Sequence, residues 1–248
     1  MNRFNGKTAL VTGGNSGIGL AAAKAYAAEG ALVVITGRDA VTLEKAQAEV
    51  DGAIALRSDA SSMREIRSLA EVLSEQGIRL DAVFINAGIA KFAPFSDVDE
   101  CLWDQTFDIN TKGAYFQIQS LLPILNSGAA ILINGSINAH IGMPGSSVYA
   151  ASKAALISLA KTLSAELLPQ GIRVNVISPG PISTPIYGKL GMDAASLETT
   201  AKEIQQQIPL GRFGTSEELA STVLHLTAPE SAFIVGTEMI VDGGMSQL

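Results

Sequence analysis

The chain has 248 residues, enough for one large α/β domain or two small ones. Its 17 basic and 24 acidic residues give a net charge of −7, which argues against nucleic acid or an anionic membrane as the main partner. No basic and apolar leader opens the chain, and no apolar run approaches the roughly 18 residues of a membrane helix. Cys101 is the only cysteine, so a reducing, cytoplasmic location is expected. With two histidines and no cluster at ligand spacing, we expect no catalytic metal.

Short β-branched runs alternate with longer Ala- and Leu-rich segments of helical period. The expected strands lie at 8–12, 32–36, 53–56, 82–85, 130–133, 173–177 and 238–241, and the expected helices at 17–29, 40–49, 62–76, 99–125, 149–168 and 216–227. Strands without polar alternation are buried on both faces. This order predicts an α/β fold with a doubly wound, seven-stranded parallel sheet, whose ligands bind at the carboxyl ends of the strands.

No linker or internal repeat divides the sequence, so residues 1–248 are expected to form a single domain. The alternation of strands and helices is interrupted at residues 181–212. We expect that segment to be a small mobile lid over a substrate.

A glycine-rich loop follows the first strand and precedes the first helix. Its spacing is G-x-x-x-G-x-G: Gly13 makes the tight turn, Gly17 admits the backbone close to a pyrophosphate, and Gly19 permits close helix–strand packing. The helix N-terminus adds N–H donors and a positive dipole. The alternative is a simple glycine-rich turn, but strand, loop and helix in this order favour dinucleotide binding. The predicted cofactor residues of the loop are Thr12, Gly13, Asn15, Ser16, Gly17, Ile18 and Gly19.

The end of the second strand selects between the two nicotinamide dinucleotides. An acidic residue there binds the ribose hydroxyl of NAD, whereas an arginine accommodates the 2′-phosphate of NADP. Here Gly37 stands in the acidic position and Arg38 follows it. Asp39 competes for the ribose, but we expect it to cap the helix that begins at Ala40. The sequence therefore favours NADP(H) over NAD(H).

Three polar residues suggest proton transfer to a carbonyl group. Tyr149 and Lys153 stand four residues apart, which places them on one face of a helix, and Ser136 lies upstream. A neighbouring ammonium favours phenolate, so Lys153 is expected to lower the tyrosine pKa from about 10. Ser136 then donates a hydrogen bond to the oxygen that Tyr149 protonates. Taken alone, the same residues also fit an ordinary helix start.

With the glycine loop, Ser136, Tyr149 and Lys153 in this order, nearly the whole chain resembles the short-chain dehydrogenase/reductase family, in its single-domain Rossmann-fold form. The resemblance implies that Ser136, Tyr149 and Lys153 are catalytic, that Lys153 also binds the nicotinamide ribose, and that Asn110 completes a proton relay. It also implies cofactor contacts for Gly37, Arg38, Asp59, Ala60, Asn86, Ala87, Gly88, Tyr149, Lys153, Pro179, Gly180, Ile182 and Thr184. The ending at 241–244 resembles a segment that commonly packs in a homotetramer.

The sequence departs from the family pattern at two positions near Ser136. Gly135 stands where many relatives have a second serine, and His140 lies where relatives vary. His140 would contact the substrate or serve a structural role, and the sequence leaves both open. The expected substrate pocket is formed by Phe92, His140, Met143 and Tyr187.

These observations predict an NADPH-dependent ketone reductase, reversible as an alcohol dehydrogenase, that acts on a small molecule. One alternative is 3-oxoacyl-(acyl-carrier-protein) reductase. That role usually requires exposed arginines, and only Arg173 offers thin support. A non-catalytic NADP-binding regulator is the other alternative, which the complete set of four catalytic residues disfavours.

Overall fold

A computed structural model describes residues 2–184 and 194–248. Its seven strands form one all-parallel sheet of order β3-β2-β1-β4-β5-β6-β7. The strands are β1 Thr8–Val11, β2 Leu32–Gly37, β3 Ile54–Arg57, β4 Leu80–Ile85, β5 Leu125–Asn134, β6 Arg173–Pro179 and β7 Glu238–Val241. The order reverses at β1, so the chain winds first to one side and then to the other. The prediction of a doubly wound seven-stranded sheet is confirmed.

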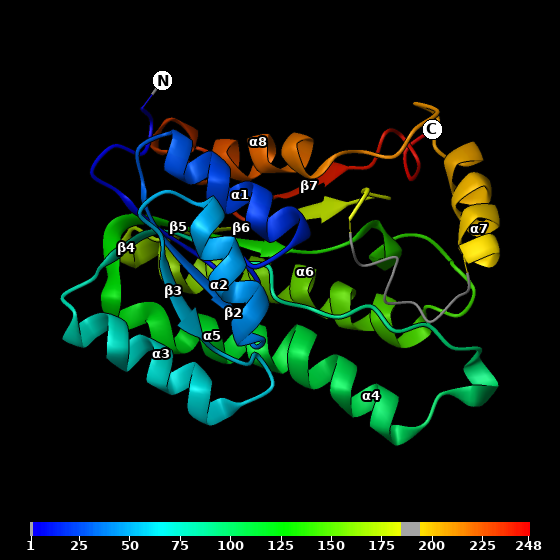
Figure 1. Cartoon of the computed structure of the whole chain (residues 1–248), viewed down its shortest axis with the longest axis horizontal. Coiled ribbons are helices and arrows are strands. Elements are labelled where there is room, and N and C mark those ends of the chain that lie inside the picture. The colour runs from blue at the N-terminus through cyan, green and yellow to red at the C-terminus, as the bar shows by residue number, and fades with distance from the viewer. Residues whose placement is uncertain (1, 185–193) are drawn as a thin grey trace.

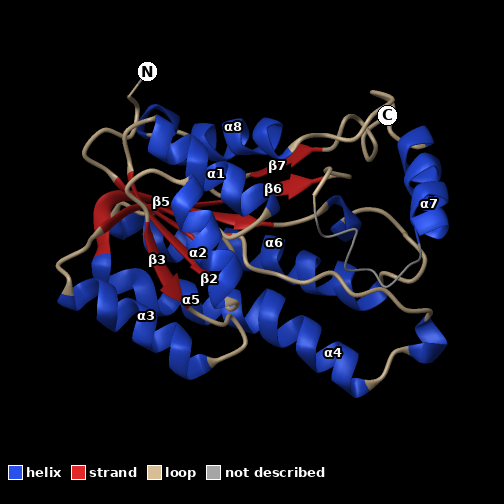
Figure 2. Ribbon diagram, in the orientation of Figure 1, coloured by secondary structure: helices blue, strands red, loops and turns tan. Residues whose placement is uncertain are grey.

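Helices cover both faces of this sheet (Figures 1 and 2). The α-helices are α1 Gly17–Ala28, α2 Ala40–Glu49, α3 Met63–Glu75, α4 Glu100–Phe107, α5 Ala114–Leu121, α6 Ser147–Leu167, α7 Ala194–Gln206 and α8 Ser216–Thr227. Buried residues of α1, α2 and α8 share one core cluster, and those of α3, α5 and α6 share the other. Among the described residues, no helix is long and apolar enough to cross a bilayer.

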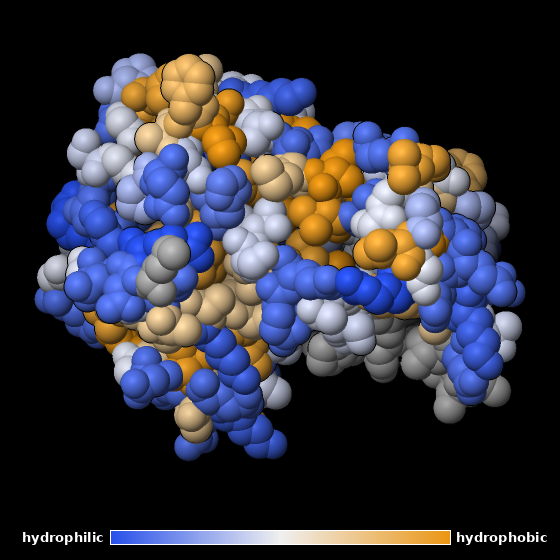
Figure 3. Space-filling model, turned by 90° about the horizontal axis from the view of Figure 1, so that it is seen from above, coloured by the Kyte–Doolittle hydropathy of each residue, from blue (hydrophilic) through white to orange (hydrophobic). Residues whose placement is uncertain are grey.

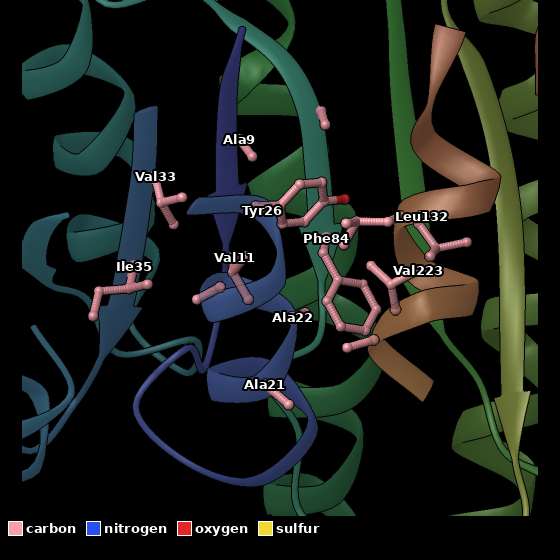
Figure 4. Packing of buried hydrophobic residues seen from close by; sticks show 14 of the residues in the cluster. Ala9, Val11, Ala21, Ala22, Tyr26, Val33, Ile35, Phe84, Leu132 and Val223 are labelled. Atoms are coloured by element: carbon pink, nitrogen blue, oxygen red, sulfur yellow. The ribbon is translucent and has the colours of Figure 1, made fainter. Parts of the chain in front are cut away.

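Each central strand sends alternate side chains into the two cores. Val11 belongs to the cluster under α1, whereas its neighbour Leu10 belongs to the cluster under α5. In Figure 4, Phe84 of β4 lies with Tyr26 of α1 and Val223 of α8 in the first of these cores. Both faces of the sheet are buried, which explains why the strand sequences are continuous runs of apolar residues.

The long helix expected at 99–125 is interrupted. A π-helical turn, Asp108–Gly113, separates α4 from α5, and a 3-10 turn containing Pro123 ends the segment before β5 begins at Leu125. A Cβ on Gly113 would lie 2.2 Å from the carbonyl oxygen of Ala60. The π turn therefore brings the helix backbone against the loop after β3, a contact that the apolar pattern of the sequence does not encode.

The interval expected to form a lid contains α7, which stands apart from the sheet near the C-terminus (Figure 1). Residues 185–193 lie outside the described part of the chain. Motion of this segment therefore remains a prediction.

Candidate active site

Tyr149, Lys153 and Ser136 meet at the carboxyl end of β5. Tyr149 and Lys153 lie in the first two turns of α6, and Ser136 follows β5 as the N-cap of a 3-10 turn. Tyr149 is hydrogen-bonded to Ser136, and Lys153 Nζ lies 5.8 Å from the centre of the tyrosine ring. The three residues are thus brought together as the sequence predicts.

The titration of this group differs from the expectation. Burial raises the pKa of Tyr149, and the hydrogen bond to Ser136 only partly opposes the rise. Burial also lowers the pKa of Lys153 to about 8. The expected lowering of the Tyr149 pKa by Lys153 is therefore wrong for this structure, because desolvation dominates. A phenol held in its neutral form is a proton donor.

Lys153 is held by a backbone carbonyl that the sequence reading overlooked. Its Nζ donates to Asn134 O at 2.7 Å. The Asn134 amide in turn donates to Asn86 Oδ1 at 2.9 Å, which joins β5 to the segment after β4. Among the residues that the structure describes, Asn134 Oδ1 is buried and accepts no hydrogen bond. The position of Asn134 in the sequence, two residues before Ser136, is the feature that could have indicated its place in the site.

Asn110 lies in the π turn and connects the loop after β4 to α6. Its Oδ1 accepts from Ile89 N at 2.8 Å, and its Nδ2 donates to Ile89 O and to Ser152 Oγ. Ser152 Oγ donates to Tyr149 O at 2.7 Å. A Cβ on Gly88 would lie 3.1 Å from Asn110 Oδ1 and 3.7 Å from Lys153 Nζ. The Asn110 side chain thus has a structural task next to the lysine.

The glycine loop is bound to the segment that follows β4. Thr12 Oγ1 accepts from the backbone N–H groups of Asn86 and Ala87, at 2.9 and 3.0 Å. Asn86 Nδ2 donates back to the carbonyls of Thr12 and Gly13. Gly13 has φ +63°, the left-handed conformation that a tight turn requires. Hydrogen bonds therefore connect the glycine loop to Asn86 and Ala87, two groups of residues that are both predicted to bind the dinucleotide.

The first turn of α1 contains the rest of the loop. Ser16 is its N-cap but makes no capping hydrogen bond with its side chain, and Gly17 and Ile18 follow it. A Cβ on Gly19 would lie 2.3 Å from Gly13 O, so the close approach is to the loop and not, as expected, to the strand. The same Cβ would lie 2.6 Å from Asn86 Nδ2, so the first turn of α1 also packs against the segment after β4.

The end of β2 is basic and exposed. Asp39 caps α2 by accepting from Thr42 N at 2.8 Å, which confirms its predicted structural role. Arg38 is exposed, and its carbonyl accepts from Arg57 Nε at 3.1 Å. The Asn15 side chain lies against Gly37 and donates to Thr42 Oγ1. The Asn15 side chain thus occupies the volume that a side chain at position 37 would need, and Arg38 is the first residue after β2.

Asp59 lies between β3 and α3, within reach of two guanidinium charges, and Ala60 follows it. Burial alone would raise the Asp59 pKa, but hydrogen bonds from Ser61 and the charges of Arg38 and Arg57 together lower it. The carboxylate is therefore ionised at neutral pH, in a predominantly positive setting.

The segment after β6 packs on the end of β7. Gly180 N donates to Val241 O at 2.9 Å, next to Pro179, the last residue of β6. Ile182 is buried and forms a bridge with Gly214, whereas Thr184 is the last residue before the gap in the described chain. Tyr187 lies outside the described residues.

The other predicted pocket residues that the structure describes have different partners, and one of them, Phe92, lies against Tyr149. The Phe92 ring meets the Tyr149 ring edge-on at 5.6 Å. Met143 accepts a contact of 3.4 Å from Asn138 Nδ2 at the far end of the Ser136 turn. The His140 side chain instead reaches Glu238 on β7, with Nε2 2.7 Å from Oε1. Nothing in the periodicity of the sequence indicated that partner.

Comparison with known proteins agrees with this geometry. Residues 13–246 match the family described as Enoyl-(Acyl carrier protein) reductase. Oxidoreductase asL5 of Sarocladium schorii is 36% identical over 255 residues, covering 100% of this chain and 99% of that protein. The 3-oxoacyl-(acyl-carrier-protein) reductase FabG of Thermotoga maritima is 32% identical, with 98% and 99% covered.

A solved structure described as a short chain dehydrogenase/reductase family protein is also similar. It is 40% identical to this chain, covers 99% of it and is itself covered to 100%, with a TM-score of 0.86. Because such matches span nearly the full length, the chain belongs to the short-chain dehydrogenase/reductase family of oxidoreductases.

Proposed function

We propose that the protein is an NADPH-dependent carbonyl reductase, reversible as an alcohol dehydrogenase. One observation carries this proposal: a partly buried, neutral Tyr149 is hydrogen-bonded to Ser136, with the Lys153 ammonium held beside it by Asn134. A neutral phenol and a hydroxyl that converge on one point suit a carbonyl oxygen that gains a proton.

The described residues fit a nicotinamide dinucleotide. The glycine loop is tight enough that a Cβ on Gly19 would clash with Gly13 O. The buried Asn134 Oδ1 has no hydrogen-bond partner among the described residues and can accept a hydrogen bond from a ligand. Residues 12–19 would hold the pyrophosphate at the N-terminus of α1, Asp59 and Ala60 the adenine, and Asn86, Ala87 and Gly88 its ribose. Pro179, Gly180, Ile182 and Thr184 would hold the nicotinamide.

A nicotinamide held by these residues would supply the hydride for the carbonyl carbon. Tyr149 donates its phenolic proton to the carbonyl oxygen, and Ser136 donates a second hydrogen bond that orients the substrate. Lys153, with a pKa of about 8, is mostly protonated at neutral pH and stabilises the phenolate that results. Asn110 supports the helix turn behind Tyr149 through Ser152.

The preference for NADPH rests on the charge at the end of β2. Arg38 is exposed there, and its charge reaches Asp59 together with that of Arg57. A guanidinium pairs with a phosphate through two parallel hydrogen bonds, and no carboxylate stands at Gly37 to receive a free ribose hydroxyl.

The second candidate is a 3-oxoacyl-(acyl-carrier-protein) reductase, which the Thermotoga maritima relative favours. The arginine that offered support for it has another task. Arg173 is buried, and its guanidinium donates to the carbonyls of Leu226, Ala228 and Ile234. A side chain held this way is not free to bind an acidic carrier protein, so we favour a small-molecule carbonyl substrate.

We also propose a homotetramer. The edge strand β7 is preceded by the exposed apolar side chains of Phe233 and Val235. Figure 3 shows hydrophobic side chains gathered in patches on the upper face, which includes α1 and α8 in the view of Figure 1. Exposed patches of this kind mark association surfaces.

The test is loss of NADPH absorbance with a panel of ketones, β-keto esters and quinones. Tyr149→Phe is expected to lower kcat by about a thousandfold, the scale of general acid catalysis, and to leave the Kd of NADPH within about twofold. Tyr26→Phe is the matched control, because it removes a buried phenol hydroxyl that bonds Thr227 in the core. Near-normal turnover by Tyr149→Phe would refute the role of the tyrosine.

A further inference from the structure

A chain of hydrogen bonds joins the active-site turn to the last strand of the sheet. Ser136 opens the 3-10 turn Ile137–Ala139, and His140 closes it. His140 Nε2 lies 2.7 Å from Glu238 Oε1, and Ser178 Oγ donates to the same oxygen at 2.5 Å. A carboxylate only accepts hydrogen bonds, so His140 has its proton on Nε2.

The burial of these groups increases from the rim inward. The His140 side chain is 38% exposed, that of Glu238 is 14% exposed, and Ser178 is fully buried. A shielded carboxylate is costly unless hydrogen bonds satisfy it. Glu238 is the first residue of β7 and lies opposite Val176 of β6, where an apolar side chain would pack without this cost. Its carboxylate therefore depends on the two partners.

Gly135 belongs to the same arrangement. A Cβ at position 135 would lie 2.4 Å from Ser178 Oγ and 2.8 Å from Val176 Cγ1. The Ser178 hydroxyl thus occupies the volume that a side chain at 135 would need. The two departures from the family pattern, Gly135 and His140, are therefore explained by one set of contacts with Ser178 and Glu238.

We propose that His140, Glu238 and Ser178 are positioning residues that hold the Ser136 turn in register with Tyr149. The turn leaves β5 at Gly135, and the His140–Glu238 contact anchors its other end to β7. With both ends anchored, the Ser136 hydroxyl is held beside Tyr149, where its hydrogen bond opposes the rise in the tyrosine pKa. A displacement of about 1 Å in such a group is enough to reduce turnover strongly. The catalytic consequence rests on the proposed carbonyl reduction, whereas the anchoring does not.

The anchoring is tested without cofactor, by hydrogen exchange of the amides of residues 136–141. His140→Leu is expected to speed their exchange about tenfold, since one hydrogen bond to a charged group is lost. His140→Gln, which can still donate to Glu238, is expected to stay close to the wild type. His225→Leu, at the exposed second histidine on α8, is the control. Unchanged exchange in His140→Leu would overturn the inference.

The catalytic consequence is tested with NADPH and 2,2,2-trifluoroacetophenone. His140→Leu and Glu238→Ala are each expected to lower kcat about tenfold, with KM and the Kd of NADPH within about twofold. The kcat of the double variant is expected to fall no further than that of either single variant, because both substitutions interrupt the same series of hydrogen bonds. His140→Gln is expected to restore kcat, and this comparison holds even if Glu238→Ala does not fold.

Two results separate the possible failures. If His140→Leu raises KM while Glu238→Ala changes nothing, His140 contacts the substrate directly and the positioning inference is overturned. If the wild type reduces no carbonyl compound, the proposed function fails, and the exchange experiment still decides whether the chain anchors the turn.

Discussion

The two ends of the proposed cofactor site differ in how firmly the protein holds them. At the catalytic end, Lys153 is buried and bonds to Asn134, and Tyr149 is partly buried. At the nucleotide end, Arg38 is exposed, and its backbone carbonyl accepts a hydrogen bond from Arg57. Buried groups have large pKa shifts and fixed geometry, whereas an exposed guanidinium acts as a mobile charge. The geometry of the catalytic end is thus fixed by the fold, whereas at the other end we propose that the choice of nucleotide depends on electrostatics.

Gly113 joins the two ends, and a substitution there should damage both. A Cβ at this position would lie 2.2 Å from Ala60 O, beside the proposed adenine site, while the same π turn carries Asn110. Gly113→Ala is expected to lower the free energy of unfolding by about 3 kcal/mol and to weaken NADPH binding, because the backbone must move apart. Thermal unfolding and fluorescence titration measure these effects.

Gly142→Ala is the matched control, since a Cβ at 142 has no atom within 4 Å among the described residues. If Gly113→Ala and Gly142→Ala unfold at the same temperature, the close contact between the two ends does not exist in solution.

The nucleotide end should respond to charge alone. Arg38→Gln is expected to raise the Kd of NADPH about 30-fold, equivalent to about 2 kcal/mol for a charge-assisted pair, and to leave the Kd of NADH within about twofold. Because the site is exposed, added salt should weaken NADPH binding to the wild type more than to the variant. Arg67→Gln, at an exposed arginine of α3, controls for net charge. An equal loss of affinity for NADPH and NADH would contradict the assignment of Arg38 to the 2′-phosphate.

The sequence predicted what depends on local pattern. Apolar runs located all seven strands, since strands covered on both faces contain little else, and helical spacing brought Tyr149 to Lys153. The capping role of Asp39 was also readable, because it needs only residues within one turn.

What the sequence did not reveal arises from long-range contacts. The π turn at 108–113 packs against Ala60, which lies more than fifty positions before Gly113, and the partner of His140 lies on β7. The sign of the Tyr149 pKa shift also depends on the number of neighbours that exclude water, which spacing along a helix does not give. Such contacts become readable only when the fold has placed the strands.

Burial of Lys153 at the catalytic end should also lower the free energy of unfolding by a measurable amount. Burial lowers the pKa of Lys153 from 10.5 to about 8, so an unfolded chain binds more protons between these values. The penalty is fully present below pH 8, on the order of 3 kcal/mol, and it is relieved as the pH rises toward 10.5. Lys153→Met removes the penalty but also the bond to Asn134 O. We therefore expect a net gain of about 1 kcal/mol at pH 7 that vanishes near pH 10.

Lys161→Met, on the exposed face of the same helix, is the matched control and should show no such pH dependence. Denaturant unfolding of both variants and the wild type at pH 7, 8.5 and 10 measures the effect. A Lys153→Met protein that is less stable than the wild type by the same amount at every pH would mean that the ammonium is well solvated in solution. The contrast between a desolvated catalytic end and an exposed nucleotide end would then be lost, and Lys153 would resemble Arg38 as a charge that water stabilises.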